Sequence, residues 1–224
     1  MKYTVLVCLI ASTLTVTSAA QIQTPPMKQG VSVQMARTAN AAPMPAADNE
    51  DAWVIAVTAD GRMFFDVKPV TPDSLTQTMI QTPRHRDQDL YIKADARTNF
   101  GNIKPALKAA VIDGFNSAIL LTNQNETASL GKLVAPKGLQ VLLTQGSAPV
   151  AVQLRDSGQK APKLMVNDRE IVMNDLQNAL NQALQRQSNR LVHLQPDDNL
   201  PFAQVAQVMD VCSSVKAKVA ISAE

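Results

Sequence analysis

The side chains best suited to chemistry are two histidines, a cysteine and two loop carboxylates. His85 lies in a charged loop and His193 on an expected strand. Neither has a cysteine or carboxylate at metal-ligand spacing. The sequence also lacks a serine nucleophile elbow, a phosphate loop and a dinucleotide motif. We therefore expect a protein that is not an enzyme and needs no metal or cofactor.

Cys212 is the only cysteine downstream of residue 20, so it cannot form an internal disulfide with that part of the chain. Its neighbours follow the pattern of a buried helix face, which predicts a small buried hydrophobic residue. The alternative is an intermolecular disulfide in an oxidising compartment.

The two carboxylates, Asp95 and Asp197, each follow an expected strand and precede an expected helix by a few residues. An aspartate in such a loop commonly accepts hydrogen bonds from backbone N–H groups. We favour this loop-capping interpretation over a catalytic one.

The N-terminus has the pattern of a targeting signal. Lys2 precedes the apolar run Val5–Ile10, and Ser18-Ala19-Ala20 suits cleavage by signal peptidase. We expect a signal peptide over residues 1–20 and export to the periplasm. The alternative is a short uncleaved anchor that holds the protein at the inner membrane.

The rest of the 224 residues divides by composition. A linker rich in Pro, Ala, Gln and Asn is expected over 21–50, with a short strand near 31–35. A first domain follows over 51–123, a second linker over 124–137 and a second domain over 138–224. The net charge of +2 gives no reason to expect nucleic-acid binding.

The first domain is expected to contain four strands, at 54–57, 63–67, 90–92 and 118–121, with a hairpin turn at 60–61. Two helices are expected, one from Thr71-Pro72 to near Pro83 and one from about Phe100 or Ile103 to Ile112.

An internal repeat connects the two domains. Residues 63–70 align with residues 164–171, and Asp95 and Phe100 align with Asp197 and Phe202. The shared order of strand, hairpin, helix, strand, helix, strand predicts an α+β protein. We expect two tandem small two-layer domains, each a mixed β-sheet packed by two helices. The alternative is one continuous α/β domain with accidental similarity.

Each half resembles the periplasmic domain of the ExbD/TolR family of biopolymer-transport proteins. The resemblance lies in the hairpin and capped-helix segments 57–65 and 69–75, in the strands that end at Asp95 and Asp197, and in the following segments 99–103 and 200–210. The family also carries a transmembrane helix with an aspartate that takes part in proton-driven motor action. Residues 3–20 contain no Asp or Glu, so we do not expect this chain to conduct ions. The resemblance implies dimerisation and contacts with envelope partners.

We therefore expect a non-catalytic binding or scaffold module in envelope biopolymer or protein transport. Its partners would be envelope proteins of TonB/Tol-type systems, and the domains would form either a homodimer or an internal pseudo-dimer. Two alternatives are a peptidoglycan-binding envelope protein and an accessory subunit of a TonB/Tol-type proton-driven complex retained at the inner membrane. The candidates for strand addition, within the chain or with another chain, are Val31, Val33, Met35, Leu139, Val141 and Leu143.

Overall fold

The computed structural model describes residues 30–83, 85, 87–123, 135–144, 149–158 and 161–222. The expected signal peptide and residues 21–29 of the expected linker lie outside this range. Among the described residues, no helix has both the length and the hydropathy needed to cross a membrane.

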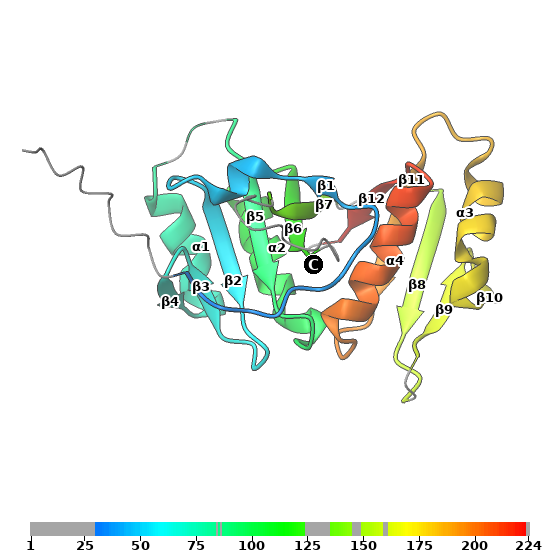
Figure 1. The fold of residues 1–224 in the computed structure, drawn as a ribbon, viewed down its shortest axis with the longest axis horizontal. Helices are drawn as coiled ribbons and strands as arrows, with labels where there is room; N and C mark the ends of the chain where they lie inside the picture. The colour runs from blue at the N-terminus through cyan, green and yellow to red at the C-terminus, as the bar shows by residue number, and fades with distance from the viewer. Residues whose placement is uncertain are drawn as a thin grey trace, which may run out of the picture.

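All strands of the described residues join into one mixed sheet (Figure 1). Its order is β10-β9-β8-β11-β12-β7-β6-β5-β2-β3-β4, and the short strand β1 pairs with β7. The strands are β1 (Ala42–Pro43), β2 (Trp53–Val57), β3 (Met63–Phe65), β4 (Lys68–Val70), β5 (Leu90–Ala94), β6 (Ser117–Thr122), β7 (Lys137–Leu143), β8 (Val150–Arg155), β9 (Lys163–Val166), β10 (Arg169–Ile171), β11 (Leu191–Pro196) and β12 (Lys218–Ile221). The helices are η1 (Pro45–Asp48), α1 (Pro72–Gln81), η2 (Phe100–Asn102), α2 (Lys104–Ile112), η3 (Met173–Asp175), α3 (Leu176–Leu184) and α4 (Phe202–Ser214).

The helix signals in the first half are accurate. Thr71 caps α1 by accepting a hydrogen bond from the Ser74 N–H, and Pro72 is the first helical residue, where a missing N–H costs nothing. The prediction of one strand over 63–67 is wrong at its end. Asp66 adopts a φ of 56°, in the left-handed region, so the chain turns there and returns as β4.

The second half repeats the element order of the first. Strands β8, β9 and β10 correspond to β2, β3 and β4, and α3, β11, α4 and β12 correspond to α1, β5, α2 and β6. In each half the first strand pairs in parallel with the strand after the first helix and antiparallel with its own hairpin. The α+β class is therefore confirmed.

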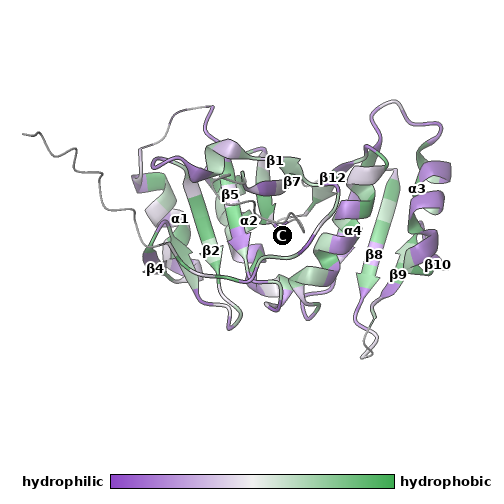
Figure 2. Cartoon of the chain, viewed as in Figure 1, coloured by the Kyte–Doolittle hydropathy of each residue, from purple (hydrophilic) through white to green (hydrophobic). Residues whose placement is uncertain are grey.

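Strand β7 joins the two halves into one sheet. It pairs antiparallel with β6 of the first half and parallel with β12 of the second. One continuous apolar core runs through both halves, and Figure 2 shows the strands largely apolar and the helices with polar stretches, most of all on α3. Within that core α1 packs on α2 and α3 packs on α4. Because the sheet and the core are both shared, the halves are packed together as one body.

Residues 30–43, which we call the N-terminal strap, run past the carboxyl ends of β5 and β6 and then pair with β7 (Figure 1). Part of this segment was expected to be a linker outside the core, and the structure corrects that. Ala36 and Ala41 are buried in the core, and Met35 packs on a small second cluster formed by Tyr91, Ile119 and Leu121. This cluster faces away from the helices because successive strand residues point to opposite faces. The strap and the residues after it therefore cover the second face of the sheet in the first half.

Candidate functional site

The candidate site lies where the two halves meet through equivalent loops. Strand β5 ends at Ala94 and β11 ends at Pro196, and the two predicted acidic residues, Asp95 and Asp197, follow directly. Each loop then leads into the second helix of its half, α2 or α4. The repeat therefore brings both carboxylates to the same position of the fold, at the carboxyl end of a parallel strand.

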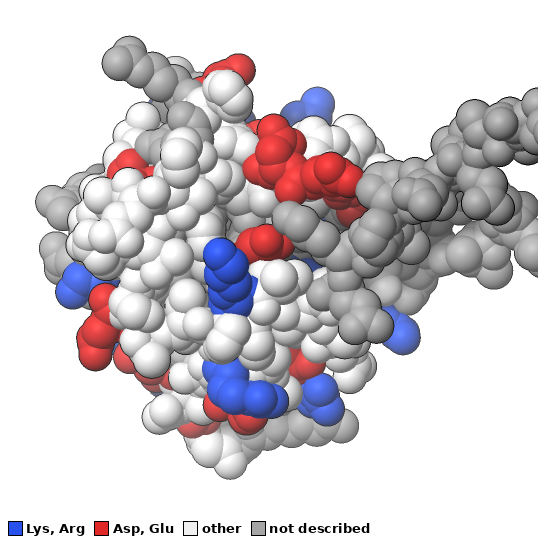
Figure 3. All heavy atoms as spheres, turned by 90° about the vertical axis from the view of Figure 1, so that its left-hand side faces the viewer, with Lys and Arg blue, Asp and Glu red and all other residues white. Residues whose placement is uncertain are grey.

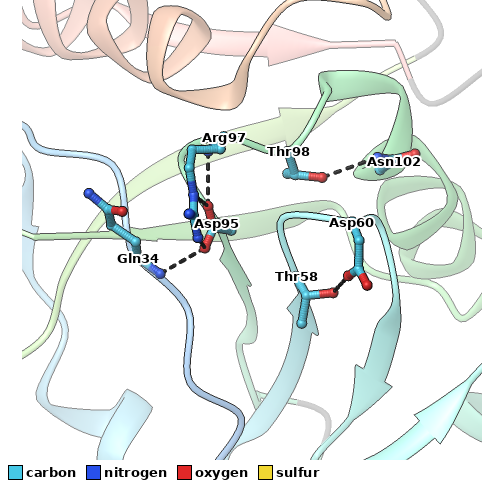
Figure 4. A network of polar contacts seen from close by, with 7 residues as sticks. All are labelled: Gln34, Thr58, Asp60, Asp95, Arg97, Thr98 and Asn102. Atoms are coloured by element: carbon cyan, nitrogen blue, oxygen red, sulfur yellow. Dashed lines mark hydrogen bonds and ion pairs between the residues drawn. The ribbon is translucent and has the colours of Figure 1, made fainter.

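Asp95 is buried and fully engaged. Its Oδ1 accepts hydrogen bonds from the Arg97 backbone N–H at 3.0 Å and from Arg97 Nε at 2.9 Å. Its Oδ2 accepts from Arg97 Nη2 and from the Gln34 backbone N–H of the strap, both at 3.0 Å (Figure 4). The Arg97 guanidinium, aided by the two backbone N–H groups, holds the pKa of this carboxyl far below its usual range, although burial acts in the opposite direction.

The surrounding loop is held by further polar contacts. Thr98 is buried, and its hydroxyl accepts a hydrogen bond from Asn102 Nδ2 at 3.1 Å. On the neighbouring β2–β3 hairpin the Thr58 hydroxyl donates to the Asp60 carboxylate (Figure 4). Gly61, which follows, has a positive φ. A Cβ on Gly61 would meet the Asn102 side chain, so the hairpin tip and the loop are in close contact.

Asp197 is more exposed than Asp95, and its side chain holds the end of β8 and the residue after it. Its Oδ1 accepts from Arg155 Nη1 at 2.8 Å and its Oδ2 accepts from the Asp156 backbone N–H at 2.9 Å. Burial raises the pKa of this carboxyl, but the Asp156 N–H and the Arg155 guanidinium outweigh that effect and leave the pKa below its usual value. Both aspartates thus have the geometry of loop-capping residues that stay ionised at neutral pH.

The two loops pair with each other about a local two-fold axis. The Phe100 N–H donates to the Leu200 carbonyl and the Phe202 N–H donates to the Thr98 carbonyl, both at 2.8 Å. The donors of the two bonds are aligned residues of the repeat, and so are the two acceptors. Such an exchange of partners is the mark of a two-fold, isologous contact.

A second reciprocal pair lies beside the first. The Gly101 N–H donates to the Asp198 carbonyl, and the Ala203 N–H donates to the Ala96 carbonyl, both at 2.9 Å. A side-chain ion pair between Lys104 and Asp198 accompanies them. A Cβ at residue 101 would approach Asp198 to 3.0 Å, so this glycine permits the close approach of the loops.

The strap also bonds to the second half, through a residue that the sequence analysis did not single out. The carboxylate of Asp210 on α4 accepts from the Ala39 N–H at 3.0 Å, from the Asn40 N–H at 2.7 Å and from Asn40 Nδ2 at 3.0 Å. The only sequence signal is a charged residue in a largely apolar helix. Because Gln34 bonds Asp95 and Asn40 bonds Asp210, the strap ties both halves together.

The six strand-addition candidates fall into two groups. Val31, Val33 and Met35 lie in the part of the strap that runs along the end of β5, where the expected strand near 31–35 is reduced to one isolated bridge, Met35 with Asp95. Lys93 Nζ donates to the Val31 carbonyl at 3.1 Å, and the Ala96 N–H donates to the Gln34 carbonyl at 2.7 Å.

The other three candidates, Leu139, Val141 and Leu143, lie in β7, which pairs on both sides within the chain. Of the two alternatives for these residues, pairing within the chain is the one found, and β7 offers no edge to a partner. Among the described strands, β4 and β10 end the sheet and pair on one side only.

The remaining chemically competent residues do not assemble. No group of three or more histidine, cysteine or acidic residues suited to a metal occurs among the described residues. His85 lines a shallow hollow of about 410 Å³ beside α1, and His193 lies on β11. Cys212 is fully buried in α4, and burial raises the pKa of its thiol to about 12, which leaves almost no reactive thiolate at neutral pH.

The family model described as "Biopolymer transport protein ExbD/TolR" matches the chain twice, over residues 3–125 and 124–224. The chain belongs to the ExbD/TolR family. The resemblance read from the sequence is thereby confirmed, and the family assigns the protein to biopolymer transport. No curated protein and no solved structure gives a significant match. The ExbD/TolR matches meet at residues 124–125, where the sequence predicts the start of the linker between the domains.

Proposed function

We propose that this ExbD/TolR protein is a non-catalytic scaffold of envelope biopolymer transport, in which two family domains pair inside one chain. The observation that carries the proposal is the reciprocal bonding of the loops around Phe100 and Phe202. Equivalent residues exchange partners there as two subunits do in a symmetric dimer. One covalent chain would thus present the paired surface that separate subunits otherwise have to assemble.

Two features support a permanent pairing. The core is continuous between the halves, and β7 lies hydrogen-bonded between them. The strap adds bonds to Asp95 on one side and to Asp210 on the other. A shared core and a shared sheet resemble an obligate interface more than a transient one.

Analytical ultracentrifugation of the purified protein tests the pairing. We expect a monomer at all concentrations, because the dimer-forming surface is already occupied by the second half. A stable homodimer would contradict internal pairing.

The partners are proposed to be periplasmic envelope proteins of a TonB/Tol-type system. Bait recovery from the cell envelope, followed by identification of the captured proteins, tests this. Co-sedimentation with purified peptidoglycan without any captured envelope protein would favour the wall-binding alternative instead.

An anchored form at the inner membrane is a second candidate. It is favoured by the family match, which begins at residue 3 and so includes the apolar run Val5–Ile10. N-terminal sequencing of the exported protein separates the two forms. A first residue downstream of Ala20 supports cleavage, and an intact N-terminus supports the anchor.

A further inference from the structure

The two ends of the sheet are equivalent by the repeat but differ in chemistry. Strand β4 ends the sheet in the first half and β10 ends it in the second, and each is the outer strand of a tight hairpin. A free edge is where an extended peptide can add as a further strand. An edge can accept such a peptide only where its outward backbone N–H groups are not already bonded.

Hairpin register decides which residue points outward. In the second half Asn167 and Asp168 both have positive φ, which defines a two-residue turn flanked by the pair Val166 and Arg169. The flanking pair is hydrogen-bonded and the next pair is not, because the two types alternate along an antiparallel ladder. Glu170, opposite Met165, therefore directs its N–H and C=O away from β9, toward the open edge.

The residue at the equivalent place in the first half is Pro69, opposite Phe64. Proline has no N–H, so the outward position of β4 has no donor. The next outward donor is also lost, because the Thr71 N–H donates to Ser74 Oγ at 2.9 Å in the capping box of α1. The β4 edge is thus closed to strand addition.

The second half keeps both donors. Val172, which follows β10, has an extended backbone (φ −93°, ψ 156°) and forms no side-chain capping bond. The same alternation points its N–H outward. With Glu170 this gives two donors and one acceptor along the β10 edge.

A hollow beside this edge can receive side chains. It has a volume of about 710 Å³ and lies between β10 and α3, where Ile171, Ala179 and Ala183 supply an apolar floor. Val172, also part of its lining, has 62% of its surface exposed, more than the other exposed large hydrophobic residues that the structure describes, Val67, Ile80 and Ile112. On an added strand, one residue would lie opposite Glu170. The residues before and after it would point to the other face of the sheet, into this hollow.

We propose that β10 is the docking edge for an extended segment of a partner protein, which adds to the sheet as one more strand. The segment would place a basic side chain opposite Glu170 and small apolar side chains in the hollow at Ile171 and Val172. Glu170 already pairs with Lys163 at 2.8 Å, but that pair is exposed and so adds little stability, which leaves the carboxylate able to take a second basic partner. The inference rests on the proposed scaffold function and names the surface that performs it.

Charge and donor content favour a foreign segment over a second copy. Pairing of two β10 strands centred on Glu170 would set two carboxylates directly opposite, which is destabilising. Pairing of β10 with β4 of another copy would meet Pro69, which cannot donate. The other end of the molecule, which carries α1 and β4, shows a group of acidic side chains in its upper part and basic side chains below them (Figure 3).

The test is an NMR titration of the full chain with a capped seven-residue peptide that has a valine–lysine–valine centre. We expect shifts and slowed hydrogen exchange at the amides of Glu170 and Val172, with none at the β4 edge. The matched variants are Glu170→Pro and Glu170→Gln. The proline copies the residue found at the equivalent edge position, whereas the glutamine removes the charge and keeps the N–H.

Glu170→Pro should bind about fivefold to tenfold more weakly than Glu170→Gln, the loss expected for one backbone hydrogen bond. As a measurement that does not depend on folding of a variant, methylation of the peptide's central backbone nitrogen should weaken binding to the wild-type chain. Equal binding by the two variants, or no change at Glu170 and Val172, would overturn the proposal. Concentration-dependent shifts at the same amides without peptide would also overturn it, in favour of a second copy. A monomeric chain that still captures an envelope protein after Glu170→Pro as well as after Glu170→Gln would refute this inference alone.

Discussion

The two halves have the same element order, but their sheets are buried to different extents. In the first half β5 is buried at nearly every position, from Leu90 to Ala94, whereas β11 in the second half alternates between buried and half-buried residues. The difference follows from Met35 of the strap and from Met44 and Ala47 after it, which cover the outer face of the first half near Tyr91. Strands covered on both faces have continuous apolar sequences, and strands covered on one face alternate.

The sheet edges differ as well. The first half closes its edge with Pro69 and a capped helix, while the second half leaves Glu170 and Val172 with outward donors. A duplicated domain can thus divide its tasks, with one copy stabilised by additional contacts and the other left available for binding. The following predictions test this comparison.

The largest effects should come from the equivalent phenylalanines of the two loops. Phe100 and Phe202 are fully buried at equivalent positions, so Phe100→Ala and Phe202→Ala should each lower the free energy of unfolding by about 3–5 kcal/mol. Urea denaturation measures both. Effects that differ by more than a factor of two would show that the two loops are not energetically equivalent.

The two capping aspartates should differ. Asp95→Ala leaves two partly buried N–H groups and the largely exposed Arg97 guanidinium without their acceptor and should cost about 2–3 kcal/mol, whereas Asp197→Ala should cost about 1 kcal/mol because that carboxylate is more exposed. Asp95→Asn, which keeps one acceptor oxygen, is the control and should be milder than Asp95→Ala. A larger loss at Asp197 than at Asp95 would reverse the comparison.

Acid should destabilise the protein through the same two groups. Both carboxyls have a folded-state pKa below the unfolded value of about 3.9, so their contribution is complete above that value and is lost as the pH falls below it. Thermal unfolding between about pH 2 and 6 should show this decline, and Asp95→Asn should flatten it more than Asp197→Asn. A pH profile unchanged by Asp95→Asn would contradict the assignment.

The helix starts should show a smaller difference. Thr71→Ala removes a capping box and should cost about 1 kcal/mol, whereas Val172→Ala removes an exposed side chain and should change stability by less than about 0.5 kcal/mol. Differential scanning calorimetry on both variants measures the comparison. A cost at Val172 equal to that at Thr71 would mean that its side chain packs more than its exposure indicates.

The smallest global effect should come from Asp210→Ala. Its bonds to the strap are exposed, so the loss of stability should be about 0.5–1 kcal/mol. Locally, the amides of Ala39 and Asn40 should exchange with solvent at least about fivefold faster, as expected for the loss of a hydrogen bond. Asp210→Asn serves as the control, and unchanged exchange in Asp210→Ala would show that the strap is held by its other contacts.

The sequence by itself determined the local elements and the family. Thr71-Pro72 located the start of α1 and Asp60-Gly61 located the first turn, because capping and turn geometry depend on neighbouring residues only. The aligned apolar positions of the two halves indicated the repeated element order. The loop-capping interpretation of Asp95 also came from sequence, since the Arg97 N–H that it accepts lies in its own loop. The donors to Asp197, at the end of β8, were not indicated by sequence.

Only the tertiary structure decided how the halves meet. The bonds of Gln34 to Asp95 and of Asn40 to Asp210 join residues far apart in the chain, and no local pattern specifies such partners. The turn at Asp66, which splits the predicted strand, depends on an aspartate in the left-handed region, a conformation that sequence only weakly indicates. The position of β7 at the centre of the sheet, paired with both β6 and β12, was also decided by the tertiary structure. An apolar strand can bond its backbone groups to any neighbouring strand, and its sequence does not specify which one.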